Sequence, residues 1–341
     1  LEQQINAYLA SHPSPYVSRT FQISGAAVPG APETLVTSQE IIKYVDQYLT
    51  GGYAAQGAGY PNAFGYLTPD LQNKFYFAPN TSFDFTLIEF QNKTLAEADA
   101  IWAAEYNKLI ANGEAPVIVW PWHDYGAADW NSDDPTKESP YSTQLFKDWI
   151  ARAYASGMEF VTLEDLASRV AAFDAAVITS TVSANTITAQ VTAANVGDMA
   201  LDVDGQGSLV IARVDGWYAY DSDSVFLPQS GGSFTITMGS TQDDVTHIID
   251  LPMRAHLLSV TGNGNDLSFS LNGEGRLVVD LSAQLASGVQ VTGATVVTKV
   301  GDLLTLDVGS YGPHTVSITR APVGPTEGDD RGATAIYGTA G

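Results

Sequence analysis

The chain lacks cysteine, has few basic residues and contains no long apolar run. Without cysteine, neither a disulfide framework nor a thiolate metal site is available. Only 15 lysine and arginine residues stand against 38 aspartate and glutamate residues, which gives a formal net charge of −23. Such a charge repels nucleic-acid phosphates and anionic membranes, so neither is expected as a partner. No apolar stretch approaches the roughly 20 residues that a membrane-spanning helix needs.

The same composition points to a place outside the cell. A cysteine-free, strongly acidic chain is typical of secreted bacterial proteins in salty surroundings, and its carboxylates suit cations such as calcium. The sequence begins at Leu1 without a signal-peptide pattern. We therefore expect a processed or excised piece of a longer extracellular protein.

The first half, residues 1–172, alternates helical and strand patterns and predicts an α/β domain. Thr37 and Glu40 match a capping box before a helix over Ile41–Leu49. The clearest amphipathic helix covers 94–111 and stops at Asn112-Gly113. Further helices are expected over 1–11, 143–156 and 163–171, and strands over 74–77, 83–89, 117–120 and 158–162.

The most informative segment is Ala115–Gly126, where an apolar strand pattern ends in chemically active side chains. In α/β folds, catalytic groups collect at the carboxyl ends of strands. This segment contributes His123 and Asp124 as candidate catalytic residues, together with aromatic side chains that sugar rings stack on or that pack a barrel mouth. These aromatic candidates for substrate binding are Trp120, Trp122, Tyr125 and the nearby Trp130.

Two motifs in this half resemble polysaccharide deacetylases of the NodB-homology class. Val119-Trp120-Pro121-Trp122-His123 matches the short apolar–His motif that ends their last barrel strand. Gly157–Leu166 (GMEFVTLEDL) matches the Gly-aromatic-x-Phe-Val-Thr-Leu segment that follows it. The resemblance covers about residues 60–172 and implies the C-terminal part of a deacetylase-like barrel. It also implies a divalent, zinc-like metal and a polysaccharide substrate.

The family's metal ligands, an Asp and a His-x-x-x-His pair, are missing. The five histidines, His12, His123, His247, His256 and His314, contain no pair with that spacing. The domain is either a degenerate relative or lacks its metal-binding front half. We favour the second explanation, and therefore expect no metal ligand on this chain and a metal-holding front half in an N-terminal fragment of the same precursor. The chain would then keep the general-acid half of the site.

Histidine suits the role of general acid because its pKa lies near neutrality and a neighbouring carboxylate raises it. The resemblance assigns the same role to His123. Asp124, or a later acid of the loop (Asp129, Asp133 or Asp134), would orient its ring. Asp84, between two phenylalanines, is the third catalytic candidate; it would orient another group, line a substrate groove, or serve as an ordinary strand-edge acid.

From Val177 onward, short alternating strands separated by turns predict an all-β region of one or two β-sandwiches. We place one at 173–252 and a second, or the other half of the first, at 253–322, with the break between Asp250 and His256. Trp217 and Tyr218, read with Tyr220 as exposed aromatics beside acids, are candidates for sugar binding or for domain packing.

The Gly- and Asp-rich tail, residues 323–341, is expected to be flexible and is similar to the run-in to hemolysin-type calcium repeats, although no complete repeat is present. Together with the acidic run Asn131–Asp134, it makes calcium a second expected ion. An ordinary solvated loop and an ordinary terminus are the alternatives.

The leading interpretation is a fragment of a secreted enzyme that deacetylates an N-acetylated polysaccharide with His123 as general acid. Two alternatives stay open. One is a glycoside hydrolase or lyase that uses carboxylates such as Asp84, and the other is a non-catalytic carbohydrate-binding or adhesive protein.

Overall fold

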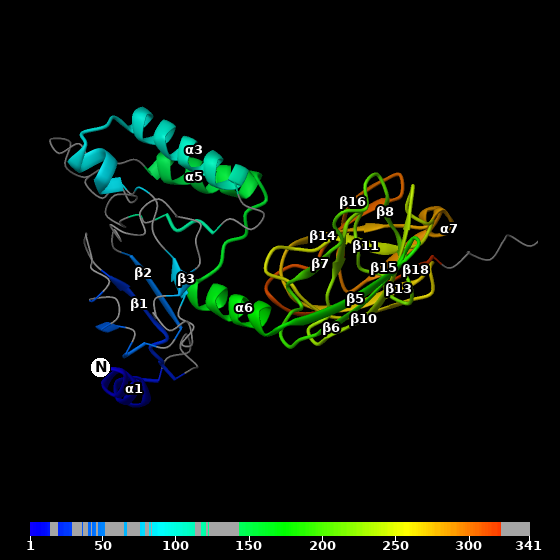
Figure 1. Ribbon diagram of the computed structural model, residues 1–341, viewed down its shortest axis with the longest axis horizontal. Helices are drawn as coiled ribbons and strands as arrows, with labels where there is room; N and C mark the ends of the chain where they lie inside the picture. The colour runs from blue at the N-terminus through cyan, green and yellow to red at the C-terminus, as the bar shows by residue number, and fades with distance from the viewer. Residues whose placement is uncertain are drawn as a thin grey trace, which may run out of the picture. The chain divides into compact units, whose positions relative to one another are not determined.

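The structure is a computed structural model in which the chain divides into two compact units, Leu1–Ala171 and Ala172–Gly341 (Figure 1). It describes residues 1–13, 20–28, 36, 40–41, 43–45, 47–51, 65–66, 76–78, 82, 84–112, 117–120, 122 and 143–321. The tail and the 123–142 loop lie outside these residues. No helix among the described residues is long and apolar enough to cross a membrane.

Unit 1 contains one four-stranded sheet in the order β1 (Gly25–Val28), β2 (Tyr48–Gly51), β4 (Tyr76–Ala78), β3 (Gly65–Tyr66). β1, β2 and β4 run parallel, and β3 is antiparallel to β4. Parallel neighbours need crossover connections, which agrees with a mixed α/β unit. A closed barrel remains an expectation that these four strands do not establish.

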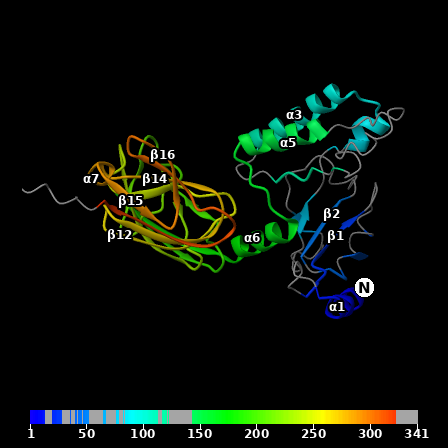
Figure 2. The same ribbon diagram turned by 180° about the vertical axis from the view of Figure 1, so that it is seen from behind.

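The helices of unit 1 are α1 (Glu2–Ser11), α3 (Leu95–Asn112), α5 (Thr143–Ala155) and α6 (Leu163–Ala175), which runs on into unit 2. Both views show α3 and α5 side by side (Figure 2). A capping box begins α3, because the Thr94 N–H donates to Glu97 at 2.9 Å and the Glu97 N–H donates to Thr94 Oγ1 at 3.3 Å. The predicted helices over 94–111, 143–156 and 163–171 are therefore confirmed.

Three local predictions for unit 1 were wrong. Phe83–Glu89 was expected as a strand, but Asp84 is helical and a π-helix, η1 (Phe85–Phe90), follows it. The adjacent residues Leu87 and Ile88 are both buried, which a strand with alternating faces does not favour. Of the expected helix Ile41–Leu49, Ile41 is helical, but Tyr48 and Leu49 belong to β2, whose pairing with β1 and β4 outweighs local helical spacing. Residues 158–162 form no strand.

The first part of unit 2 is a four-stranded antiparallel sheet in the order β5 (Val177–Ser183), β6 (Thr186–Thr192), β10 (Gly231–Gly239), β8 (Val210–Val214). A small pair, β7 (Ala200–Asp202) and β9 (Ser224–Phe226), accompanies it. Their shared hydrophobic cluster, the upstream core, contains Ile187, Val191, Val196, Val203, Ile211, Val214, Tyr220, Val225, Leu227, Phe234, Ile236 and Met238.

The second part of unit 2 is a β-sandwich. One sheet has the order β11 (His247–Asp250), β14 (Arg276–Asp280), β17 (Leu303–Asp307), β16 (Thr295–Val300). The other has the order β12 (His256–Gly262), β13 (Leu267–Gly273), β18 (Gly312–Arg320), β15 (Val289–Thr292), and the short helix α7 (Ala283–Ala286) precedes β15. Both sheets bury side chains in a second cluster, the downstream core, which includes Ile248, Leu257, Phe269, Leu277, Leu304 and Ile318.

The all-β character of residues 177–320 is thus confirmed. The expected break between Asp250 and His256 does not coincide with the change of sheet, because β11 precedes it and yet pairs with β14. The chain therefore passes from the first sheet to the sandwich before His247.

Candidate functional site

The chain reaches the candidate catalytic segment through Val117–Trp120, which has a single bridge residue at Val119 in place of the expected strand. Trp120 and Trp122, at its end, are half-buried. His123, Asp124, Tyr125 and Trp130 lie outside the described residues, so their roles stay predictions.

Trp120 and Trp122 belong to an aromatic cluster with Trp102 of α3 and Trp149 and Phe146 of α5, here called the tryptophan cluster. The Trp120 ring lies 4.6 Å from Trp149, 4.8 Å from Trp122 and 5.1 Å from Trp102, measured between centroids. Tilted and edge-on aromatic pairs at such distances each contribute about 0.5–1.5 kcal/mol beyond burial. The cluster therefore anchors the point from which the chain continues to His123.

The polar atoms of the cluster tie it to the segment before η1. The indole N–H of Trp102, a residue that is only 1% exposed, donates to the Ser82 carbonyl at 2.9 Å. The Ser82 hydroxyl donates to Glu105 of α3 at 2.6 Å. The buried indole N–H of Trp120 meets no acceptor in the part of the chain that the structure describes.

Asp84 is fully buried at the start of η1 and has an interaction partner. A carboxylate without exposed surface suits the positioning of another group better than direct contact with a polymer. Short π-helical turns are frequent at functional sites, where they re-aim side chains. A catalytic role for Asp84 therefore stays a prediction.

Glu105 is an acid on the inward face of α3 that the sequence analysis did not single out. It shares the inward face of α3 with Trp102 and Tyr106, both buried, and its Oε2 atom is buried without a hydrogen-bond partner among the described residues. The signal was in the helical spacing: positions 98, 102, 105, 106 and 109 form one apolar stripe with a single acid in it.

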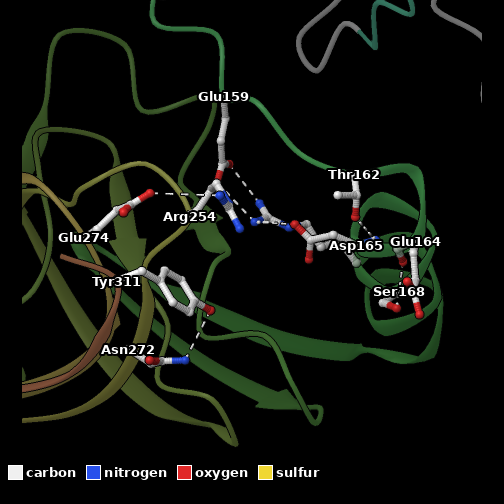
Figure 3. A network of polar contacts seen from close by, with 10 residues as sticks. Glu159, Thr162, Glu164, Asp165, Ser168, Arg254, Asn272, Glu274 and Tyr311 are labelled. Atoms are coloured by element: carbon white, nitrogen blue, oxygen red, sulfur yellow. Dashed lines mark hydrogen bonds and ion pairs between the residues drawn. The ribbon is translucent and has the colours of Figure 1, made fainter. Parts of the chain in front are cut away.

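The Gly157–Leu166 motif has a clear structural use. Gly157, with φ of +80°, ends α5, and the N–H of Met158 donates to the Ala153 carbonyl at 3.1 Å. Thr162 then caps α6, since its hydroxyl accepts from the Asp165 N–H at 3.1 Å (Figure 3). The motif is therefore a helix stop followed by a helix start.

Arg169 of α6 links the segment before the helix to the first turn of the helix. Its guanidinium makes a bidentate contact with Glu159, at 2.8 and 3.1 Å, and lies 3.2 Å from Asp165. Paired contacts of this kind hold geometry as well as charge. Glu159 and Asp165 of the motif thus stabilise the local fold.

Among the described residues, no group of three or more His, Asp or Glu side chains gathers as metal ligands would. The zinc-like ion implied by the deacetylase resemblance stays an expectation about other residues, and so does calcium, because Asn131–Asp134 and 323–341 are outside the described ranges.

In unit 2 the aromatic run that was read as an exposed sugar platform is instead packed. Tyr220 is fully buried, and Trp217 and Tyr218 are half-buried against the downstream core. The Trp217 indole N–H is shared between the carbonyls of Phe226 at 2.9 Å and Ala219 at 3.1 Å. The reading of this run as exposed was wrong, because its polar neighbours concealed its contacts with both cores.

Asp221, an acid beside this run, accepts hydrogen bonds from neighbouring backbone groups. Asp221 Oδ1 accepts from the N–H groups of Asp223 at 3.0 Å and Ser224 at 2.7 Å, and burial raises the pKa of Asp221.

Elsewhere in the unit, the Arg254 guanidinium lies over the Tyr311 ring, 5.5 Å from its centroid, and 4.0 Å from Glu274 (Figure 3). These groups satisfy one another within the fold.

Comparison of the chain with protein-family models, with curated proteins and with solved structures finds no match.

Proposed function

We propose that unit 1 is the general-acid part of a secreted hydrolase that removes acetyl groups from an N-acetylated polysaccharide. The observation that carries the proposal is the tryptophan cluster, which anchors Trp120 and Trp122 immediately before His123. An acid catalyst needs a fixed starting point, because a small displacement of the reacting group sharply lowers the rate.

His123 would donate a proton to the departing amine, which otherwise leaves as a strongly basic anion. Because the ordinary pKa of histidine is near 6.5, both the protonated donor and its conjugate base are present near neutral pH. Asp124 would orient the imidazole, and the buried Asp84 would act behind the reacting groups. The water-activating half of the site, with its metal ligands, would come from a separate N-terminal fragment of the precursor, because this sequence contains no His-x-x-x-His pair.

Substrate contact is assigned to the aromatic residues of this region, since flat rings suit sugar faces. Trp120 and Trp122 are half-buried and belong to the anchor as well, whereas Tyr125 and Trp130 are the candidates outside the described residues. Unit 2 would act as an accessory β-region of the secreted protein, and Trp217 and Tyr218 serve packing there.

The geometry favours this reading over a carboxylate-based glycosidase built on Asp84. Both acids of a glycosidase flank the scissile bond and must reach the sugar, but the Asp84 side chain has no exposed surface. No described feature singles out a purely adhesive role.

The test is acetate release from chitin oligosaccharides with zinc supplied, measured for the protein as isolated from its source and for the 341-residue chain. We expect His123→Asn to reduce the rate by about 10²-fold or more. His12→Asn is the matched control, because His12 is an exposed histidine in unit 1. Equal rates for the His123 variant and the control would refute the assignment of His123, and no acetate from either form would refute the deacetylase proposal.

A further inference from the structure

β5 is the outermost strand of its sheet and is paired on one side only, with β6. The pairing is regular over seven residues, from Val177 opposite Thr192 to Ser183 opposite Thr186. All seven residues of β5 are exposed. The opposite edge of β5 therefore offers a straight row of backbone donors and acceptors.

The core-side face of the sheet continues onto β5 without a cover. Ile178, Ser180 and Val182 lie opposite Val191, Ala189 and Ile187, which are all buried on β6. On β5, by contrast, Ile178 is 54% exposed and Val182 is 63% exposed. Two β-branched apolar side chains thus project beyond the upstream core.

The other edge strands of the three four-stranded sheets in unit 2 carry features that discourage pairing with another chain. The pairing of β8, β11, β12 and β16 with their neighbours contains a shift in register. β11 and β15 are only four residues long, and β16 carries the charged Lys299. β5 has no charge, no proline and no shift. It is the unprotected edge among them.

The charge pattern narrows the choice of partner. Residues 175–197, which contain β5 and β6, include no Asp, Glu, Lys or Arg, in a chain with a net charge of −23. Two copies of so acidic a protein repel each other, so they can approach closely only through a neutral surface. β5 lies in such a surface.

The sequence of β5, VITSTVS, is nearly palindromic about Ser180. We propose that β5 pairs antiparallel with β5 of a second copy, with a two-fold axis through Ser180. This register places Ile178 opposite Val182 of the second copy and Thr179 opposite its Thr181. Apolar β-branched pairs and Thr–Thr pairs are favourable across strands, and a two-fold interface requires this reciprocity.

The product is one continuous eight-stranded sheet across two molecules. Backbone hydrogen bonds along β5 supply the attraction, and the exposed faces of Ile178 and Val182 are covered at the same time. Since net repulsion opposes association, added salt strengthens the dimer by screening it.

Sedimentation equilibrium of the full chain tests the pairing. We expect the wild type to reach twice the monomer mass with rising concentration, and more readily in high salt. Ser180→Lys places two like charges at the axis and should keep the protein monomeric. Thr188→Lys on β6, which is exposed but not at the edge, is the control and should dimerise like the wild type.

A mixture of Ser180→Lys and Ser180→Glu provides the decisive measurement, because the two charges face each other only in this register. We expect the mixture to form a heterodimer while Ser180→Lys alone stays monomeric, and circular dichroism verifies that each variant is folded. A wild type that remains monomeric at all concentrations overturns the proposal. So does a dimer that Ser180→Lys leaves intact, which would indicate another interface.

Discussion

The rings of Tyr220 and His247 stack face to face, with centroids 4.2 Å apart and planes 14° from parallel. Both residues are fully buried. The stack lies where the two cores of unit 2 meet, because the Tyr220 N–H donates to the Ile248 carbonyl at 2.9 Å and the Ile248 N–H donates to Tyr218 at 2.9 Å. Tyr220 belongs to the upstream core and Ile248 to the downstream core.

His247 should make the stability of unit 2 depend on pH. Burial lowers the pKa of His247 below its ordinary 6.5, and Nδ1 lies 2.8 Å from the Val245 carbonyl, whereas Nε2 is buried without a partner in the described ranges. The unfolded chain therefore binds a proton at a higher pH than the folded one. The free energy of unfolding should fall as pH drops below 6.5, by at most about 1.4 kcal/mol per pH unit.

Urea unfolding at pH values from about 5 to about 8 checks this, with His247→Phe as the variant and His314→Phe as the control. The nearby Asp221, Asp250 and Asp280 act with the opposite sign, because burial raises their pKa values above 3.8 and their contribution to stability is lost as pH rises. The difference between wild type and His247→Phe isolates the imidazole. An unchanged slope in His247→Phe would contradict the prediction.

The hydroxyl of Tyr220 should be dispensable. It is buried without a hydrogen-bond partner among the described residues, and burial raises the pKa of the phenol. Removing an unsatisfied buried group relieves its desolvation penalty, so Tyr220→Phe should raise the free energy of unfolding of unit 2 by about 1 kcal/mol.

The matched control is Tyr106→Phe in unit 1, since Tyr106 is as buried but its hydroxyl bonds to Ser156. That substitution should lower the stability of its own unit by about 1 kcal/mol. Equilibrium unfolding, read from the transition of the unit that carries each change, measures both. A loss of stability in Tyr220→Phe would mean that its hydroxyl has a partner.

Much of the fold was predictable where local rules and tertiary contacts agree. The helix over 94–111 begins at a capping box and presents one apolar stripe, and the strands after Val177 alternate as half-buried strands do. Position 157 was predictable as a helix end because glycine tolerates its positive φ.

The rest depended on contacts between distant residues. Tyr48–Gly51 becomes a strand only because β1 and β4 lie on either side of it. Trp217 looks exposed in a run with Asp215 and Asp221, yet both of its hydrogen bonds and its 5.9 Å contact with Phe234 are internal. Glu105 accepts a hydrogen bond from Ser82, twenty-three residues away, which no local pattern indicates.

Thr162 should stabilise α6 through its hydroxyl. The Thr162 hydroxyl satisfies the Asp165 N–H, so Thr162→Ala should lower the free energy of unfolding of unit 1 by about 1 kcal/mol. Thr162→Ser keeps the hydroxyl and should therefore keep most of this stabilisation. Thermal unfolding with helical circular dichroism compares the two. Equal losses in both variants would show that the methyl group, and not the hydroxyl, matters at this position.

Gly293, in the turn between β15 and β16, should be less replaceable than Gly301, in the turn between β16 and β17. Its φ is +83°, and an added Cβ would lie 1.9 Å from the Thr315 carbonyl oxygen, which is backbone and has little room to move. Gly301 has a similar φ of +61° but open space around it. Gly301→Ala should therefore cost only the conformational strain, about 1 kcal/mol.

Gly293→Ala should cost that strain plus the displacement of β18, about 3 kcal/mol or more in total. Urea denaturation of the two alanine variants measures the difference directly, because the strain is common to both. If the variants were equally stable, β18 would have to yield at Thr315 without loss, and the β15–β18 pairing from Val289 to Thr292 would be looser than its regular register indicates.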